Sequence, residues 1–182
     1  MDRLAKYMEL IIGIQKKGPY IFMGYSAGGT LAFELAKYME QSGYVVSDII
    51  MLDAQARMKK WLETEQDIIN EAQFTVDFFT SQKVYKKYFD DVLKEELLEN
   101  VKNYLTYWNN SFSTEMVDAT IHQLKAIKTA ETENFKHWEE HDKDYCLYEG
   151  SGTHYEMLIE PHLKKNAELL NNILANKFTI KV

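Results

Sequence analysis

The chain has 182 residues, of which 46% are hydrophobic and 27% are charged. This length and composition are typical of a globular protein with one sizeable core. The 21 Lys and Arg residues against 28 Asp and Glu residues leave a formal net charge of -7. Because nucleic acids and anionic membranes attract basic surfaces, this charge balance argues against both classes of partner.

Cysteine content and the distribution of apolar residues indicate the cellular compartment in which the protein is expected. The single cysteine, Cys146, cannot form an internal disulfide, and its place in an apolar run favours a small core residue over a reactive thiol. The sequence shows no secretory signal pattern and no apolar run of the length needed to cross a bilayer. We therefore expect a cytoplasmic protein.

The first part of the chain predicts one helix followed by one strand. Apolar residues at Leu4, Met8 and Ile11 recur at helical spacing. The turn dipeptide Gly18-Pro19 then precedes a short apolar run at 20–23, Tyr-Ile-Phe-Met, which predicts a buried strand.

The sequence Gly-Tyr-Ser-Ala-Gly at 24–28 directly follows this strand. In a nucleophile elbow, a serine lies on a sharp turn between a strand and a helix, and glycines two residues to either side leave room for the backbone. Apolar residues recur at helical spacing from Ala27 to Gln41, and Gly43 supplies a stop signal. Strand, turn and helix occur in the required order, which favours Ser26 as the nucleophile over a plain glycine turn.

A serine nucleophile needs a base that is itself held by an acid. The apolar run from Val45 to Leu52 predicts a second strand, and Asp53 follows it. The carboxyl ends of parallel strands share one edge of a sheet, so Ser26 and Asp53 are expected on the same side. Asp53 is therefore the candidate acid, and a helix cap or turn former after the strand is the alternative.

Among the five histidines, His154 has the position expected of the base. The short run Tyr145–Tyr148 predicts another buried strand, and His154 lies in the glycine-bearing loop after it. The chain order Ser26, Asp53, His154 is that of α/β hydrolases. For the other histidines we expect packing or surface roles: His122 in a predicted strand, His137 and His141 in a charged stretch, and a solvated His162 in the first turn of a helix behind Pro161.

The segment between residues 54 and 118 departs from the alternation of strands and helices. One amphipathic helix opens at Thr64 and a second near Asp90 and Asp91. These helices either bury one face against the domain or form an apolar bowl, which predicts a helical lid over 54–118. The apolar positions are Ile68, Ala72, Val76 and Phe79, then Val84, Tyr85, Tyr88 and Phe89, then Leu97, Val101, Leu105 and Trp108. The run 121–127 returns to the sheet, and a closing helix carries Leu163, Ala167, Leu170 and Leu174.

From about Asp2 to its C-terminus the chain resembles the peptide-releasing, type I thioesterase domain of nonribosomal peptide synthetases. In this family the acid follows the strand after the nucleophile helix, as Asp53 does, whereas most α/β hydrolases place it one strand later. Stand-alone editing thioesterases usually carry His and Met around the serine, where this chain has Tyr25 and Ala27, which favours the releasing type. The matching runs are Gly-Pro-Tyr at 18–20, Gly-Tyr-Ser-Ala-Gly-Gly at 24–29, Leu-Ala-Phe-Glu at 31–34, Ile-Ile-Met-Leu-Asp at 49–53 and Gly-Thr-His-Tyr-Glu-Met-Leu at 152–158.

The resemblance implies a single α/β-hydrolase domain over 1–182, with a mostly parallel sheet flanked by helices. It implies a serine thioesterase in which Ser26, His154 and Asp53 release an acyl-peptide by hydrolysis or macrocyclisation. The peptide would arrive on the 4'-phosphopantetheine arm of a peptidyl carrier domain, and the chain itself is expected to bind no cofactor and no metal. The backbone N–H of Ala27, directly after the nucleophile, is the expected oxyanion donor.

The segment before the elbow strand is short for this family. We expect the N-terminal half-sheet to be missing, and with it the loop that donates the second oxyanion N–H. Losing one such donor typically costs about 10²- to 10³-fold in turnover. The elbow strand would then form an unpaired sheet edge through which the chain self-associates. A free-standing esterase or editing thioesterase, and an impaired fragment that acts as an assembly or interaction piece, are the alternatives.

Overall fold

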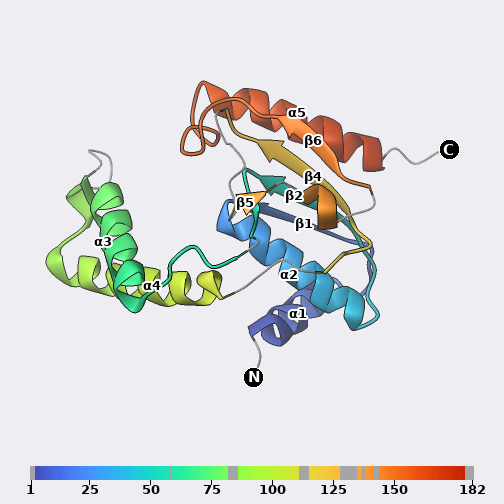
Figure 1. Ribbon diagram of the computed structural model, residues 1–182. Helices are drawn as coiled ribbons and strands as arrows, with labels where there is room; N and C mark the ends of the chain where they lie inside the picture. Colours follow the sequence, from blue (N-terminus) through green and yellow to red (C-terminus); the bar gives the residue numbers. More distant parts are fainter. Residues whose placement is uncertain are drawn as a thin grey trace. The chain divides into compact units, whose positions relative to one another are not determined.

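The computed structural model describes residues 3–57, 59–81, 86–110, 115–127, 135–136, 138–141 and 144–178. The chain divides into two compact units (Figure 1). Met1–Ala56 and Ser113–Val182 form the first unit, and Arg57–Phe112 form the second. The candidate residues Ser26, Asp53 and His154 all belong to the first unit.

A four-stranded sheet forms the middle layer of the first unit. Its strands are β1 (Tyr20–Tyr25), β2 (Val46–Leu52), β4 (Thr120–Lys125) and β6 (Cys146–Glu149). They lie in the order β1-β2-β4-β6, and the pairings β1–β2, β2–β4 and β4–β6 are parallel. The strands expected from the sequence are confirmed. Because β1 and β2 run in the same direction, the residues that follow them emerge at the same edge of the sheet.

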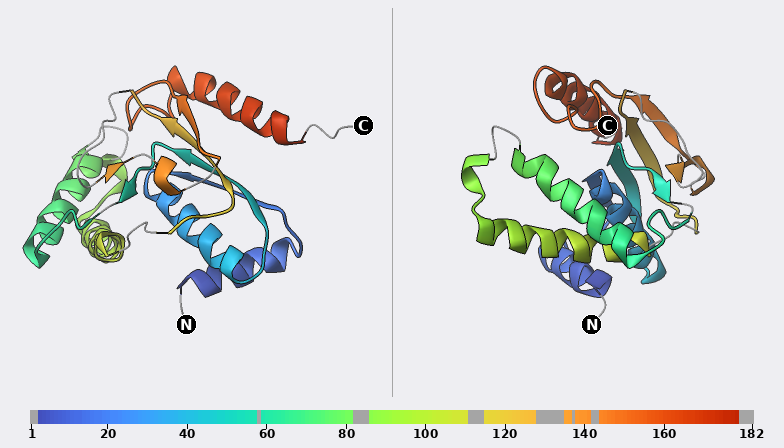
Figure 2. Two further views of the ribbon diagram at one scale, coloured as in Figure 1. Left: turned by 45° about the vertical axis from the view of Figure 1, so that its right-hand side comes forward. Right: turned by 60° about the vertical axis from the view of Figure 1, so that its left-hand side comes forward.

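Helices cover both faces of this sheet (Figures 1 and 2). The predicted helices α1 (Arg3–Ile14) and α2 (Ala27–Gln41) lie on one side, and α5 (His162–Phe178) lies on the other. In β2, Ile50 and Leu52 belong to the buried cluster that also contains Ile173 of α5. The apolar run of β2 therefore reflects a strand that is buried on both faces.

The strand β6 departs from the expected buried strand. Its side chains alternate between half-buried and exposed, because β6 is the last strand in the sheet order. Cys146 is accordingly a free, half-buried cysteine, and the expectation of a core cysteine is wrong. An alternating pattern is usual where one face of a strand packs on the core and the other meets solvent.

Short elements accompany the main sheet. β3 (Ala56–Arg57) and β5 (Phe135–Lys136) form a two-stranded sheet. The 3-10 helix η2 (Trp138–His141) follows β5. The indole ring of Trp138 is fully buried and lies 4.5 Å from the ring of Phe33 in α2, measured between centroids. This contact ties a segment late in the chain to the helix that follows the elbow.

The second unit consists of α3 (Glu65–Ser81), the 3-10 helix η1 (Lys86–Tyr88) and α4 (Asp91–Asn109). The predicted helix starts are confirmed by their caps. Thr64 and Asp67 form a reciprocal capping box, and Asp90 accepts a hydrogen bond from the N–H of Leu93 at 2.8 Å. Leu62, Ala72 and Leu105 form the buried core of this unit, flanked by Ile68, Leu98, Val101 and Trp108.

Some side chains of this segment differ from the expected apolar faces. Leu98, rather than Leu97, packs against the core of the unit. Phe79 is 40% exposed, because it lies in the last turn of α3 beyond the packed face. Tyr88 is exposed too, while Val84 and Tyr85 lie outside the described residues. That residues 54–118 act as a lid stays a prediction.

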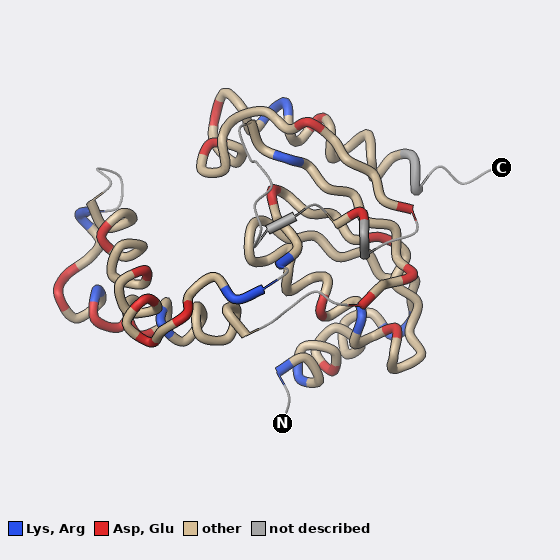
Figure 3. Tube along the Cα trace, in the orientation of Figure 1, with Lys and Arg blue, Asp and Glu red and all other residues tan. Residues whose placement is uncertain are grey.

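Charged residues of both signs occur along both units (Figure 3). This distribution accompanies the formal net charge of -7, and the coloured, described part of the trace shows no continuous run of basic residues. None of the helices within the described ranges is long and apolar enough to span a membrane.

Candidate active site

Ser26 lies on the strained turn between β1 and α2. Its backbone has φ 54 and ψ -126, in the left-handed half of conformational space that L-residues rarely adopt. Its N–H donates a hydrogen bond to the carbonyl oxygen of Leu52 at the end of β2 (2.8 Å), which fixes the turn against the neighbouring strand. This is the backbone geometry expected of a nucleophile elbow.

The glycines around Ser26 differ in whether the surrounding space requires a glycine. A Cβ on Gly24 would collide with the backbone of Gly28 and Gly29, so the turn requires glycine at this position. A Cβ on Gly28 would meet nothing within 4 Å, which corrects the expectation that both flanking glycines make room for the backbone. The second tight position is Gly29, where a Cβ would collide with the Cβ of Ala54.

Asp53 directly follows β2 and is held by its backbone and by both carboxylate oxygens. Its φ is 44, and its side chain is 2% exposed. Its N–H donates to the carbonyl oxygen of Leu124 (2.7 Å), and its Oδ1 accepts from the N–H of Ala126 (2.9 Å). The carboxylate is thus anchored to the residue that directly follows β4, and Oδ2 is left to bind the imidazole.

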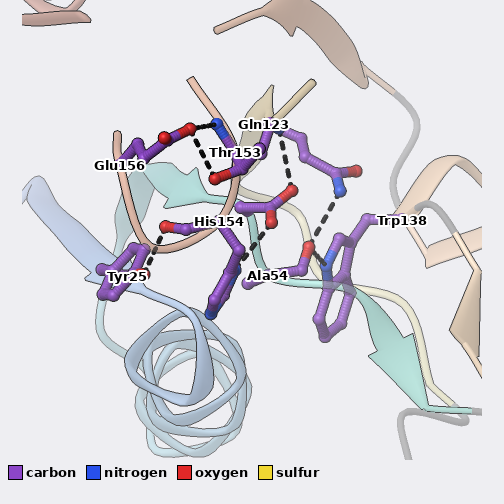
Figure 4. Close-up of polar contacts among 9 residues, drawn as sticks. Tyr25, Ala54, Gln123, Trp138, Thr153, His154 and Glu156 are labelled. Atoms are coloured by element: carbon purple, nitrogen blue, oxygen red, sulfur yellow. Dashed lines mark hydrogen bonds and ion pairs between the residues drawn. The ribbon is translucent and has the colours of Figure 1, made fainter. Parts of the chain in front are cut away.

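The residue after Asp53 is anchored by side chains that no local pattern in the sequence predicts. The carbonyl oxygen of Ala54 accepts hydrogen bonds from Gln123 Nε2 (2.8 Å) and Trp138 Nε1 (2.9 Å), as Figure 4 shows. The Tyr145 hydroxyl in turn donates to Gln123 Oε1 (2.6 Å). Both Gln123 and Trp138 are fully buried, and no local sequence pattern relates them to Asp53.

The loop that carries His154 is tied to the sheet and to α5. The N–H of Gly150 donates to the carbonyl oxygen of Lys125 (2.8 Å), and Gly152 adopts φ +86. Buried Asn166 of α5 accepts from the N–H of Ser151 (2.7 Å) and donates to the carbonyl oxygens of Ser151 and Met157, each at 2.8 Å. One asparagine therefore holds both sides of this loop.

His154 Nδ1 lies 2.7 Å from Asp53 Oδ2. With the hydrogen on Nδ1 donated to the carboxylate, Nε2 is the nitrogen that can accept a proton from a nucleophile. The carboxylate is almost fully buried while the imidazole side chain is 32% exposed, so the pair reaches from the core to the surface.

Ser26 and His154 are brought to the same edge of the sheet, but the described structure contains no hydrogen bond between their side chains. Such bonds are often long in free enzymes and tighten when substrate binds. Tyr25 bridges the two segments instead: its hydroxyl donates to the carbonyl oxygen of His154 (2.6 Å), as Figure 4 shows. Ala27 is the first residue of α2, where backbone N–H groups have no acceptor within the helix.

The remaining described histidines lie elsewhere. His122 is buried, and its Nε2 lies 2.9 Å from Asp48 Oδ1 within the sheet, which confirms the expected packing role. His162 is not simply solvated, because its Nδ1 lies 2.9 Å from Ser151 Oγ in the loop before α5. His137 and the side chain of His141 lie outside the described residues. Within the described ranges, no group of three or more His, Cys, Asp or Glu residues could hold a metal ion.

A parallel sheet flanked by helices, with a serine on a strained strand-to-helix turn and an Asp–His pair at the same edge, defines an α/β hydrolase. The structure resembles that of the thioesterase domain that cyclises the lipopeptide antibiotic surfactin, with a TM-score of 0.78. That domain is 32% identical, over 95% of this chain and 75% of that one. A Vlm2 thioesterase domain matches with a TM-score of 0.70 at 21% identity, over 92% of this chain and 74% of that one, and supports the fold alone.

Comparison with protein families and curated proteins defines the family. The thioesterase domain family matches residues 2–157. Bacitracin synthase 3 of Bacillus licheniformis is 34% identical over the whole of this chain, which spans 3% of that protein. Surfactin synthase subunit 3 of Bacillus subtilis (strain 168) is 32% identical over the whole chain, which spans 14% of it. The chain belongs to the thioesterase domain family, whose members are hydrolases that act on thioesters.

Proposed function

We propose that the chain releases an acyl-peptide from a carrier-domain thioester through an ester to Ser26. The observation that carries the proposal is the 2.7 Å contact between His154 Nδ1 and Asp53 Oδ2 at the sheet edge where the Ser26 elbow emerges. The similarity to bacitracin and surfactin synthases over the whole chain supports a peptide as the acyl group.

In the first step, Ser26 Oγ attacks the thioester carbon while His154 Nε2 takes the hydroxyl proton. Asp53 keeps the imidazole in the tautomer that leaves Nε2 free. The carbonyl oxygen becomes an oxyanion, which the N–H of Ala27 stabilises at the start of α2. The C–S bond then breaks, and the proton passes from His154 to the departing sulfur. The sulfur belongs to the 4'-phosphopantetheine arm of a peptidyl carrier domain.

In the second step, the ester between the peptide and Ser26 is broken. Either water or a nucleophile within the peptide attacks the same carbonyl carbon, and His154 takes its proton. The C–Oγ bond breaks and the proton returns to Ser26 Oγ. Water yields a linear acid, whereas an internal amine or hydroxyl yields a macrocycle.

A serine-reactive fluorophosphonate tests the triad directly. Intact mass spectrometry should find a single adduct on the wild-type protein and none on Ser26→Ala. Asp53→Asn should slow labelling by about 10⁴-fold, because the imidazole then loses the tautomer that accepts the serine proton. A folded wild-type protein that takes up no adduct would refute the proposal.

The substrate class is tested by comparing a peptidyl thioester loaded on a carrier protein with a small p-nitrophenyl ester. A releasing thioesterase should favour the carrier-bound thioester in kcat/KM. Preference for the small ester would instead indicate a free-standing esterase. Mass spectrometry of the released peptide distinguishes hydrolysis from cyclisation, because cyclisation retains no added water.

We also propose that a protein made of these 182 residues associates with itself through β1. Within the described residues, β1 pairs with β2 alone, and Met23 on this strand is 62% exposed. Edge strands with exposed apolar side chains pair with other chains, and a lysine on the edge prevents such pairing. Sedimentation velocity should show oligomers for the wild type and fewer for Met23→Lys; a wild type that sediments as a monomer at every concentration would refute this proposal.

A further inference from the structure

Tyr25 joins the nucleophile turn to the histidine loop through two contacts. Its hydroxyl donates a hydrogen bond to the carbonyl oxygen of His154 at 2.6 Å. Its ring also stacks on the imidazole of His154, with 5.0 Å between ring centroids and 25° between planes. Both contacts converge on one residue that lies 129 positions away in the chain. Tyr25 therefore touches both the main chain and the ring of the candidate base.

We propose that Tyr25 is a positioning residue for acyl transfer, which aligns the imidazole of His154 with Ser26. This inference rests on the proposed function of the Ser26 site. Tyr25 is covalently joined to Ser26 and contacts His154, so a displacement of the elbow would be transmitted to the histidine. Such coupling keeps two reacting groups aligned although they lie on separate segments, and alignment of this kind is a large part of enzymatic rate enhancement.

The other contacts of His154 reach the elbow less directly. Asp53 binds Nδ1 and fixes which nitrogen faces substrate, and it is joined to the elbow through the main chain of Leu52, whose carbonyl oxygen accepts the N–H of Ser26. Tyr155 meets the imidazole edge-on at a centroid distance of 5.1 Å and is the next residue of the same loop. The contact with Tyr25 is a direct one between the histidine and the residue beside Ser26.

The hydroxyl of Tyr25 also stays a donor throughout the pH range in which the enzyme would work. Burial, followed by the nearby negative charge of Asp53, raises the pKa of Tyr25 to about 12. The phenol therefore remains protonated, and its hydrogen bond to a backbone carbonyl is available at neutral pH.

Tyr20 offers a matched control on the same strand. Its hydroxyl also donates to a backbone carbonyl, that of Gln15, at 2.8 Å, and it contacts no residue of the candidate triad in the described structure. Tyr20→Phe and Tyr25→Phe thus each delete one phenol-to-carbonyl hydrogen bond from β1 and keep the ring. Any common loss of stability cancels in the comparison.

The test measures the inactivation of both variants and of the wild type by a fluorophosphonate over a range of concentrations. Tyr25→Phe should lower the maximal inactivation rate constant by about fivefold to tenfold, the factor expected from one hydrogen bond, with little change in half-saturating concentration. Tyr20→Phe should leave both constants unchanged, although both variants lower Tm slightly. Hydrogen exchange of residues 153–157 should quicken in Tyr25→Phe alone.

Each result has one meaning. A Tyr25→Phe protein with wild-type inactivation constants and wild-type exchange at 153–157 would overturn the positioning role while leaving the proposed function intact. An equal fall in the inactivation constant for both variants would also overturn it, because the effect would then follow from stability alone. A folded wild-type protein that is never labelled would overturn the proposed function and, with it, this inference.

Discussion

The two candidate residues at the ends of β1 and β2 share an unusual backbone. Within the described ranges, Ser26 (φ 54) and Asp53 (φ 44) are the residues other than glycine with positive φ. Such conformations cost of order 1–3 kcal/mol each and persist where the surrounding structure enforces them. Here the enforcing contacts are backbone hydrogen bonds from Ser26 to Leu52 and from Asp53 to Leu124. Both turns follow neighbouring parallel strands and therefore lie at the same edge of the sheet.

At this scale, Ser26→Gly should be more stable than Ser26→Ala. Glycine adopts positive φ without a Cβ penalty, so we expect a difference of about 1 kcal/mol in the free energy of unfolding. Urea denaturation of both variants measures it. The control pair is Ser42→Gly and Ser42→Ala, at φ -88, where glycine should give no advantage. Equal stability of the two Ser26 variants would contradict strain at the elbow.

The pH dependence of stability follows from Tyr25. Its pKa is about 12 in the folded protein against about 10 in the unfolded chain, so unfolding releases protons between these values. The contribution of Tyr25 to stability is therefore complete below about pH 10 and is lost as pH rises through about 12. Urea midpoints measured from pH 9 to 12 should fall less steeply for Tyr25→Phe than for Tyr20→Phe, because only the second variant keeps the Tyr25 hydroxyl. Equal slopes of midpoint against pH for the two variants would contradict a raised pKa of Tyr25.

At the scale of elements, the elbow depends on how closely α2 approaches the ends of β1 and β2. Gly24 and Gly29 have no room for a Cβ, since one faces the backbone of α2 and the other faces Ala54. The histidine loop is packed as closely, because a Cβ on Gly150 would collide with Met157 and a Cβ on Gly152 would collide with His162. Close packing therefore shapes both the elbow and the histidine loop.

The glycines of the motif provide a prediction with its control built in. Gly24→Ala should destabilise the protein by about 3 kcal/mol or more, because its Cβ would overlap backbone atoms that cannot move aside. Gly28→Ala should be neutral or more stable by up to about 1 kcal/mol, since the position is open and lies in a helix. Thermal unfolding compares them. Similar Tm values for both variants would contradict the steric account.

The attachment of the histidine loop to α5 predicts the effect of Asn166→Asp. A buried carboxylate would replace the amide that donates to the carbonyl oxygens of Ser151 and Met157. We expect a loss of about 3 kcal/mol in the free energy of unfolding, together with slower labelling of Ser26. Asn172→Asp, on the exposed face of the same helix, should change stability by less than about 0.5 kcal/mol. Equal effects of the two substitutions would show that the loop does not depend on Asn166.

At the scale of the whole molecule, the chain has a separate core in each of its two units. The first is a three-layer arrangement around the parallel sheet, and its four main strands and its helices α1, α2 and α5 are those expected from the sequence. The second is the α3 and α4 core around Leu62, Ala72 and Leu105. Arg57 lies 3.7 Å above the ring of Trp108 within this second unit, a cation–π contact that periodicity does not predict.

Local patterns predicted most of the fold because each depends on neighbours in sequence. The apolar run of β2, the helical spacing of α2 and the caps at Thr64 and Asp90 are all short-range features. Predictions failed where the position of an element in the whole sheet mattered. Cys146 lies in an apolar run, yet β6 ends the sheet order, so its side chains alternate between half-buried and exposed.

The sequence by itself determined the elbow, the order of Ser26, Asp53 and His154, and the family, because turns, periodicity and motif order are written in consecutive residues. Only the tertiary structure decided the contact of Asp53 with His154 across 101 positions and the bond from Tyr25 to His154 across 129. It also revealed Gln123, Trp138 and Asn166 as the groups that hold the two loops. These contacts depend on strand order and packing, which bring together side chains that no local pattern relates.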